Sequence, residues 1–380
     1  MPCSIVFKDE LSSGHKRTAP MARILSWYAL FPFVLSAGCS SPPADEPVIV
    51  PSHVQPVAKT SVRMEAFSGF IGGRWKMTTL AGTDTYDTWY WGPERNSIRK
   101  MTAGTAPSGE PWHAMSVFFW HPGRKEVRTL SVSPAFRGVS EGTFTFDGQK
   151  AAGLIDMHQT TGHRVLGKRW TFEGPDRYHD ELLDKVPEGF SLQNEWRRFR
   201  VEAPSEDELA AERTRTAAAR PSEFIKPLER LLGHIWEGKA VLEVAAPPPA
   251  DTLPTTRTTF EYVPDADAIY GRVQTLDADG TPSHSMDLYL YHHTGARVLR
   301  CLALANSNDG DGVVYEGDIT PGDNGRWLRL DLRAHQSSGV STIEARIDFE
   351  PPGSVRFRAW STEGKDRILI FDHVQSEATK

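Results

Sequence analysis

The sequence predicts an all-β protein made of two tandem antiparallel meander β-barrels, with about ten strands each. Three observations predict this fold class. The chain repeats itself, short strand-like runs follow one another through hairpin-length loops without crossover helices, and each repeat opens with a short helical pattern. A meander of this length with a substantial apolar face removes its exposed edges most completely by closing into a barrel.

The internal repeat is visible as pairs of similar segments. The segment MSVFFWHPGRKEV from Met115 matches MDLYLYHHTGARV from Met286 without a gap, 171 positions later. The segment TWYWGPERNSI from Thr88 matches TFEYVPDADAI from Thr259 at the same offset. Because further pairs extend the match across both halves, we expect the two halves to share one fold.

The N-terminal segment predicts export. Lys16, Arg17 and Arg23 precede an apolar run over Ile24–Leu35, and LSAGC follows, ending at Cys39. This is the order of parts in a signal peptide. The run is too short to span a hydrocarbon core of about 30 Å, which takes about 20 residues. The segment resembles the lipobox of bacterial lipoproteins, and the resemblance implies cleavage before Cys39 and acylation of that residue.

The organisation along the chain follows from composition and spacing. The expected units are a lipoprotein signal peptide at 1–38, a proline-rich tether at 39–60, barrel 1 at 61–203, a helical linker at 204–221 and barrel 2 at 222–376. The linker opens with Ser205 and Glu208 at capping-box spacing. Gly72 and Gly233 follow the short helix of each barrel, where left-handed geometry suits a helix end.

Composition excludes several classes of function. The net charge is −6, and an acidic surface repels phosphate backbones, so we expect no nucleic-acid binding. With Cys39 acylated and Cys3 removed with the leader, Cys301 is left as a small buried apolar residue, and no disulfide framework forms. The acidic stretch at 306–312 lacks the spacing of an EF-hand loop and predicts a polar hairpin connection. No catalytic motif is present, so we expect no enzymatic activity.

Alternation along the strands predicts which side chains line the barrels, because alternate residues share a face. In both copies of the matched strand, the face that begins with Met is apolar, so we expect it to point inward. The expected ligand-binding residues are Trp89, Trp91, Met115, Val117 and Phe119 in barrel 1, and Phe260, Tyr262, Met286, Leu288 and Leu290 in barrel 2. Small barrels either fill their interior with side chains or leave room for one small ligand, and both options stay open.

A family resemblance rests on the start of each barrel. Gly73-Arg74-Trp75 fits the G-x-W signature of lipocalins, whereas in the second copy two residues separate Gly233 from Trp236. Both copies share the pattern G-x-x-W, through Gly72 and Gly233. A short helix, this pattern and a meander of about ten strands resemble the calycin superfamily of lipocalin-like barrels. The resemblance implies a barrel fold and the binding of a hydrophobic ligand.

Histidines recur at matching places in the two copies. His121 and His292 open a hairpin turn, where an imidazole readily caps backbone groups. His158 and His335 head related HQ elements. A related ten-stranded family, the nitrobindin-like haem proteins, ligates iron through a barrel histidine, but here alternation places both on the face opposite the apolar one. Since His292 and its neighbour His293 point to opposite faces, they cannot jointly hold a metal, so we expect no cofactor and no metal site.

Together these features predict an exported, lipid-anchored cell-envelope protein. Ser40 after the acylated cysteine, rather than an aspartate, favours the periplasmic face of the outer membrane. We expect the barrels to bind an apolar small molecule, as a carrier or sensor. The alternative is a non-catalytic scaffold with filled barrels, whose Trp120, Tyr289 and Tyr291 would form one exposed aromatic patch. An enzyme would need a polar triad inside one barrel.

Overall fold

The fold was taken from a computed structural model of the chain. It describes residues 64–378, apart from gaps at 80–81, 107, 135–137, 188, 209, 211–220, 242–253, 265, 278–279, 307–309, 351–352 and 363–367. The predicted signal peptide, Cys39 and the tether therefore lie outside the described residues.

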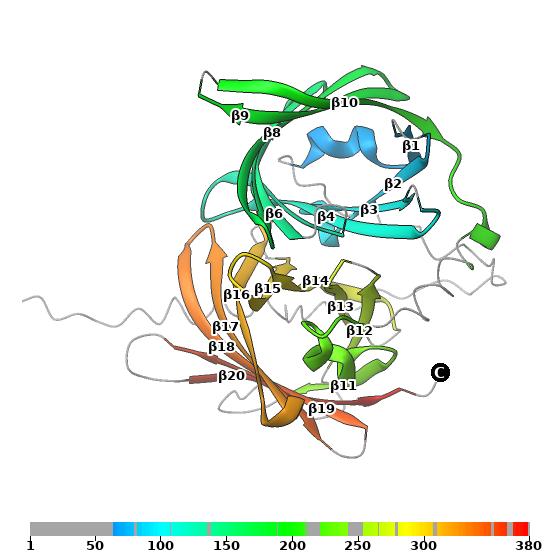
Figure 1. Ribbon diagram of the computed structural model, residues 1–380. Coiled ribbons are helices and arrows are strands. Elements are labelled where there is room, and N and C mark those ends of the chain that lie inside the picture. Colours follow the sequence, from blue (N-terminus) through cyan, green and yellow to red (C-terminus); the bar gives the residue numbers. More distant parts are fainter. Residues whose placement is uncertain are drawn as a thin grey trace, which may run out of the picture.

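Barrel 1 consists of a short 3-10 helix followed by ten strands (Figure 1). Its elements are η2 (Glu65–Phe70), β1 (Arg74–Thr78), β2 (Asp84–Trp91), η3 (Pro93–Arg95), β3 (Ser97–Thr105), β4 (Pro111–His121), β5 (Glu126–Ser133), β6 (Gly138–Phe146), β7 (Lys150–Gln159), β8 (Gly162–Gly174), β9 (Arg177–Val186) and β10 (Gly189–Val201). Each strand pairs antiparallel with its neighbours in the chain, and β1 also pairs with β10, which closes the barrel.

Barrel 2 repeats this arrangement. Its elements are η4 (Lys226–Leu231), β11 (Ile235–Val241), β12 (Thr255–Val263), β13 (Ala268–Leu276), β14 (Pro282–His293), β15 (Val298–Ala305), β16 (Val313–Gly322), η6 (Asp323–Gly325), β17 (Trp327–Gln336), β18 (Gly339–Glu350), β19 (Ser354–Ser361) and β20 (Ile368–Glu377). Strand β11 pairs with both β12 and β20. The predicted fold class, two closed antiparallel ten-strand barrels, is confirmed.

The short helix at the start of each barrel closes one end. Apolar side chains of η2 and η4 lie in the barrel cores, and Gly72 and Gly233 end both segments at φ +81° and +77°, as left-handed geometry there requires. The tryptophan of the G-x-x-W pattern fastens the helix. The indole N–H of Trp75 donates to the Phe70 carbonyl at 2.9 Å, and that of Trp236 donates to the Leu231 carbonyl at 3.3 Å.

At the start of the linker, Ser205 and Glu208 form the expected capping pair. The backbone N–H of Ser205 donates to the Glu208 carboxylate at 2.8 Å, and the Glu208 N–H donates back to the Ser205 hydroxyl at 3.2 Å, which is the capping-box arrangement. Residues 211–220 of the linker lie outside the described part of the chain. Among the described residues, no helix is both long and apolar enough to cross a membrane.

A one-residue bulge in β14 makes the two barrels differ in register. Gly104 and Thr105 pair with two consecutive residues of β4, Trp112 and Pro111, but the equivalent Thr275 and Leu276 pair with His284 and Pro282. Ser283 is therefore an extra residue. Beyond it, β14 corresponds to β4 at an offset of 172 and not 171, as the pairing of Ser97 with Phe119 and of Ala268 with Tyr291 shows.

This shift corrects the predicted face of β4. A displacement of one residue turns every side chain to the opposite face of a strand. Met286, Leu288 and Leu290 face the interior of barrel 2, as predicted. Met115, Val117 and Phe119 correspond to Asp287, Tyr289 and Tyr291 instead, and they lie on the outside of barrel 1. The interior face of β4 carries Phe118 and Trp120.

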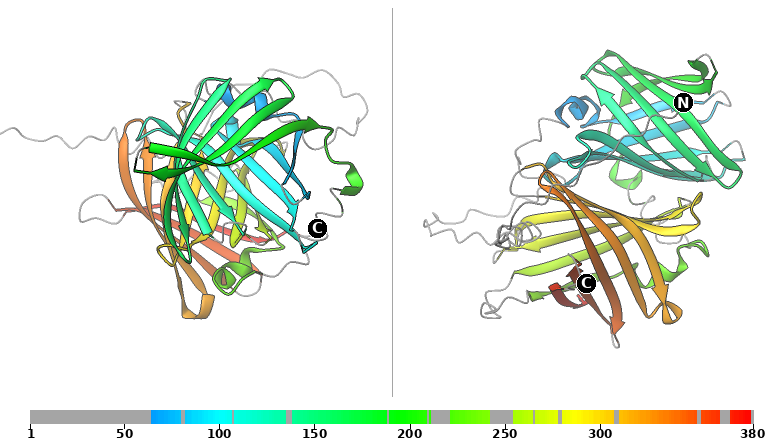
Figure 2. Two further views of the ribbon diagram at one scale, coloured as in Figure 1. Left: turned by 45° about the horizontal axis from the view of Figure 1, so that its top comes forward. Right: turned by 90° about the vertical axis from the view of Figure 1, so that its left-hand side faces the viewer.

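The two barrels pack against each other through these outer faces, which we call the seam. Figure 1 shows β3, β4 and β6 of barrel 1 above β13 to β16 of barrel 2, and the right view of Figure 2 shows barrel 1 on barrel 2 from the side. The buried apolar residues of the seam are Met115, Val117, Phe119, Leu130, Val132 and Val139 from barrel 1, and Val263, Ala266, Ala268, Tyr270, Tyr289, Tyr291, Leu302, Leu304 and Val314 from barrel 2. At its edge the buried Arg99 guanidinium lies 3.7 Å from the Tyr270 ring centre.

Candidate functional site

The η2 end of barrel 1 is filled with aromatic rings. Phe70 of η2 stacks on Trp89 with ring centres 4.3 Å apart and meets Trp170 and Tyr178 edge-on at 5.3 and 5.2 Å. Trp91 packs against the same cluster. Trp89 and Trp91 therefore face the interior as predicted, but they form a solid floor together with η2.

The middle of barrel 1 holds a charged network. The Arg198 guanidinium bridges Asp87 at 2.5 Å and Asp180 at 3.1 Å. Lys168 binds Asp180 at 2.5 Å, whereas the ammonium of Lys100 lies 3.7 Å from Asp87. The network is completed by the Thr102 hydroxyl, which donates to Asp87, and by the Trp170 indole, which donates to Asp180.

Burial and pairing set the protonation of this network. Burial alone raises the pKa of Asp180, but the charges of Lys168 and Arg198 outweigh it and lower the pKa to about 2. Burial lowers the pKa of Lys100, and Asp87 only partly opposes this effect. The network contains three cations and two carboxylates. Asp180 is thus a member of a structural ion-pair network.

The same positions in barrel 2 are neutral. From the strand pairings, Asp87 corresponds to Thr258 and Arg198 to Gln375. The other three equivalent pairs are Lys100 and Gly271, Lys168 and Ala345, and Asp180 and Phe357. The Gln375 amide donates to the Thr258 hydroxyl at 3.0 Å, so a neutral hydrogen bond replaces the ion pair.

Barrel 2 therefore has an uncharged interior, which is mainly apolar but also contains buried polar side chains such as His373 and Gln375. Phe260, Tyr262 and Leu290 are buried in its core, while Met286 and Leu288 pack against the core but remain partly accessible. The inward-facing residues Ala345, Phe357 and Ala359 are also partly accessible. These partly accessible apolar residues lie on β14, β18 and β19. Burial raises the pKa of Cys301 to about 12, which makes its thiol a poor nucleophile.

The aromatic patch expected of a scaffold is not exposed. Tyr289 and Tyr291 are buried in the seam, at 0% and 3% relative exposure, and Trp120 packs against the interior cluster of barrel 1. The prediction of one exposed patch over these residues is wrong because the bulge places Trp120 on the other face and because the two barrels cover each other.

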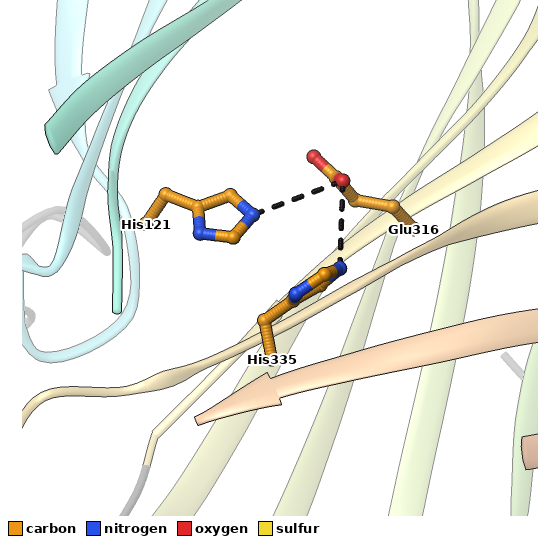
Figure 3. Close-up of side chains that lie close together, drawn as sticks. All are labelled: His121, Glu316 and His335. Carbon is orange, nitrogen blue, oxygen red and sulfur yellow. Dashed lines mark ion pairs between the residues drawn. The ribbon is translucent and has the colours of Figure 1, made fainter. Parts of the chain in front are cut away.

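Two clusters of ionisable side chains lie where the two barrels meet, and each combines residues of both barrels. In the first cluster the Nε2 atoms of His121 and His335 lie 3.8 and 3.7 Å from a Glu316 oxygen (Figure 3). In the second, Nε2 of His293 lies 3.9 Å from a Glu141 oxygen, and its ring centre is 4.7 Å from that of His158.

The clusters are equivalent by strand register. His121 and His293 both end a strand before a turn, and each accepts a hydrogen bond at Nδ1 from the backbone N–H three residues later, at 3.1 Å. The turn-capping role predicted for His121 is confirmed, but its counterpart is His293 and not His292. His292 stacks instead on Phe224 at 4.2 Å. His158 and His335 lie outside the barrels, as alternation predicted.

Sequence reasoning missed these clusters. It matched His121 with the wrong histidine of the His292-His293 pair and did not single out Glu141 or Glu316. Aligning the turns on Gly123 and Gly295 would have given the offset of 172 and the correct pair. The meeting of the two copies across one seam depends on tertiary packing, which the sequence pattern does not contain.

An open groove of about 610 Å³ lies outside the barrels, between η4 and η6. Its wall combines Glu223, Glu229 and Asp323 with Lys226 and Arg230, so acidic and basic groups alternate. None of the predicted ligand-binding residues lines it.

Comparison with known proteins shows no family for the chain. No protein-family model and no curated protein matches the chain. The crystal structure of Rv2717c from M. tuberculosis is similar at 16% identity and a TM-score of 0.31, covering 42% of this chain and all of that one. A protein of unknown function from the DUF3598 family of Nostoc punctiforme is similar at 12% identity and a TM-score of 0.16, covering 84% of this chain and all of that one.

Proposed function

We propose that the protein is a non-catalytic binding protein of the lipocalin-like kind, in which barrel 2 holds one apolar small molecule. The observation that supports this is the accessible apolar wall formed by Met286, Leu288, Ala345, Phe357 and Ala359. Pockets for small molecules are concave and mostly apolar, with few polar groups. Barrel 1, with its aromatic floor and charged network, has a structural role and stabilises the packed pair of barrels.

The proposal also places the protein at the cell envelope, as a carrier or sensor. Acylation of Cys39 would anchor it to a membrane, and the proline-rich segment at 39–60 would hold barrel 1 away from the surface. The expected location is the periplasmic face of the outer membrane. Replacement of Cys39 by Ser should abolish incorporation of labelled fatty acid and release the chain from the membrane fraction.

Ligand binding is tested with N-phenyl-1-naphthylamine, a neutral probe that fluoresces in apolar surroundings. The full chain should bind it saturably. Ala345→Phe fills the accessible wall of barrel 2 and should weaken binding about tenfold, equivalent to about 1.4 kcal/mol. Ala152→Phe makes the same change on the exposed surface of barrel 1 and serves as the matched control.

Two outcomes would count against the proposal. One is probe fluorescence that does not saturate with the full chain. The other is an equal effect of Ala345→Phe and Ala152→Phe. Either result would favour the scaffold function with filled barrels. Native mass spectrometry of the chain after exposure to a bacterial lipid extract gives an independent readout, because a carrier retains an adduct.

A further inference from the structure

The first seam cluster brings three metal-ligating side chains to one point. His121 comes from the end of β4, Glu316 from the middle of β16 and His335 from the end of β17 (Figure 3). One ligand atom from each lies within 4.8 Å of the other two. The site is therefore complete only because barrel 1 and barrel 2 are packed together.

The three groups face one another without hydrogen bonding. The distances of 3.8 and 3.7 Å between imidazole Nε2 and the Glu316 oxygen exceed those of hydrogen bonds. His121 is fully buried, and its Nε2 has no hydrogen-bond partner. A buried polar atom without a partner costs about 1–3 kcal/mol. A tetrahedral Zn²⁺ with bonds of about 2.1 Å places its ligands about 3.4 Å apart, close to the spacing seen here.

We propose that His121, Glu316 and His335 bind one divalent transition-metal ion of the Zn²⁺ class at the seam. Two imidazoles and one carboxylate suit Zn²⁺ better than Ca²⁺, which prefers oxygen ligands. The bound ion completes its coordination with water and fastens the two barrels together. Its role is structural linkage between barrels, separate from ligand binding inside barrel 2.

The second cluster shows why only the first is proposed. There the Glu141 carboxylate already accepts hydrogen bonds from the Tyr291 hydroxyl at 3.0 Å and the Arg300 guanidinium at 3.2 Å. The guanidinium of Arg300 thus occupies the place beside Glu141 that a metal ion would take. In the first cluster Phe119 stands at the position of Tyr291 and has no hydroxyl.

The arginine of the first cluster is turned away. Arg128, equivalent to Arg300, pairs with Glu126 at 3.4 Å. The position of Glu126 is occupied in barrel 2 by Val298, which has no charge. Glu126 thereby holds Arg128, whose guanidinium acts on the Glu316 carboxylate through its charge, while the described contacts include no hydrogen bond between Arg128 and Glu316.

The hairpin of His121 is compatible with metal binding. Ligation through Nε2 requires a proton on Nδ1, so metal binding breaks the hydrogen bond that Nδ1 now accepts from the Arg124 N–H and moves these two donors apart. That N–H also donates to the His121 carbonyl at 3.1 Å, so it keeps an acceptor when Nδ1 is protonated. In the second cluster the Ala296 N–H donates to His293 Nδ1, and the described contacts give it no second acceptor.

The test is a titration of the metal-free full chain with Zn²⁺, in competition with a chromophoric chelator. One ion should bind per chain. His335→Ala should weaken binding by at least about 100-fold, since loss of even an outer-shell partner costs 10- to 100-fold. His158→Ala, the matched change in the second cluster, should leave the affinity unchanged. Co²⁺ in place of Zn²⁺ should give the absorption of a tetrahedral site.

A second variant tests the geometry without removing a ligand. Glu126→Val copies the second cluster and frees Arg128 to pair with Glu316, so it should weaken Zn²⁺ binding while circular dichroism shows an intact fold. The proposal fails if the full chain binds no Zn²⁺, if His158→Ala weakens binding as much as His335→Ala, or if Glu126→Val has no effect on affinity.

Discussion

The two barrels share strand order, length and a closing helix, yet their interiors are opposite in character. Barrel 1 encloses five charged residues, Asp87, Lys100, Lys168, Asp180 and Arg198, whereas the corresponding positions of barrel 2 carry no charge. A closed barrel therefore depends on strand pairing and on a filled floor, and both barrels have these. The side chains that fill the rest of the barrel interior can differ, from charged to uncharged, without a change of fold.

The difference also separates two ways of stabilising one architecture. Barrel 2 gains from burying apolar area, at about 25 cal/mol per Å². Barrel 1 keeps a network whose members depend on one another, because a buried charge without its partner is far more costly than a missing methyl group. The two barrels should therefore respond differently to equivalent substitutions and to acid.

The largest effect is expected from breaking the network at its centre. Arg198→Gln leaves Asp87 and Asp180 without their shared cation and should lower the free energy of unfolding by about 3–5 kcal/mol. The double variant Asp87→Thr with Arg198→Gln copies the pair found in barrel 2 and should recover most of that loss. In barrel 2, Gln375→Ala removes one neutral hydrogen bond, which is worth about 1 kcal/mol.

Urea unfolding followed by circular dichroism measures these differences. The proposed difference between the barrels would be wrong if the double variant were as unstable as Arg198→Gln. It would also be wrong if Gln375→Ala lowered the free energy of unfolding as much as Arg198→Gln does.

The next effect is an acid sensitivity specific to barrel 2. Burial lowers the pKa of His284 and of His373 to about 4, below the usual 6.5. Because the unfolded chain binds these protons first, stability is complete above pH 6.5 and falls as the pH drops to 4, by about 3 kcal/mol for each histidine. His373→Leu should flatten this part of the profile. Urea midpoints measured between pH 7 and 4 test it, and an unchanged slope would contradict the assignment.

The smallest effect is expected from barrel 1 at lower pH. The pKa of Asp180 is about 2 in the folded protein and 3.8 when unperturbed. The lowered pKa contributes stability that is complete above pH 3.8 and is lost as the pH falls to 2, amounting to about 2 kcal/mol. Asp180→Asn should remove this dependence, although it also lowers stability at neutral pH. Thermal unfolding of the unmodified chain and of Asp180→Asn from pH 4.5 to 2 measures this dependence, and the difference in stability between the two proteins should narrow as the pH falls.

The architecture could be predicted because each sequence pattern determines the structure of the few residues around it. The G-x-x-W pattern, the capping pair at Ser205 and Glu208, and the turn glycines each determine their own neighbourhood. The wrong face of β4 arose from Ser283, because one inserted residue leaves a convincing gapless match and reverses its meaning. Both faces of β4 are apolar, because one lines barrel 1 and the other is covered by barrel 2. The sequence pattern of this strand therefore does not indicate which face points inward.

The site was less predictable than the fold. Phe260, Tyr262, Met286, Leu288 and Leu290 were placed correctly inside barrel 2, because there the opposite face carries the polar Asp287 and the choice is clear. The seam clusters combine residues of barrel 1 and barrel 2 that lie between 135 (293 − 158) and 214 (335 − 121) positions apart, and only the packing of one barrel on the other brings them together.

The reciprocity of the seam says something about the origin of such a chain. Each cluster takes a glutamate and one histidine from one barrel and the hairpin histidine from the other. A surface that meets its own copy in this way belongs to a symmetric dimer. Fusion of two copies into one polypeptide makes that dimer permanent at any dilution. Once fused, the two halves can diverge, and the charged interior of barrel 1 beside the uncharged interior of barrel 2 is a difference that a permanent pairing permits.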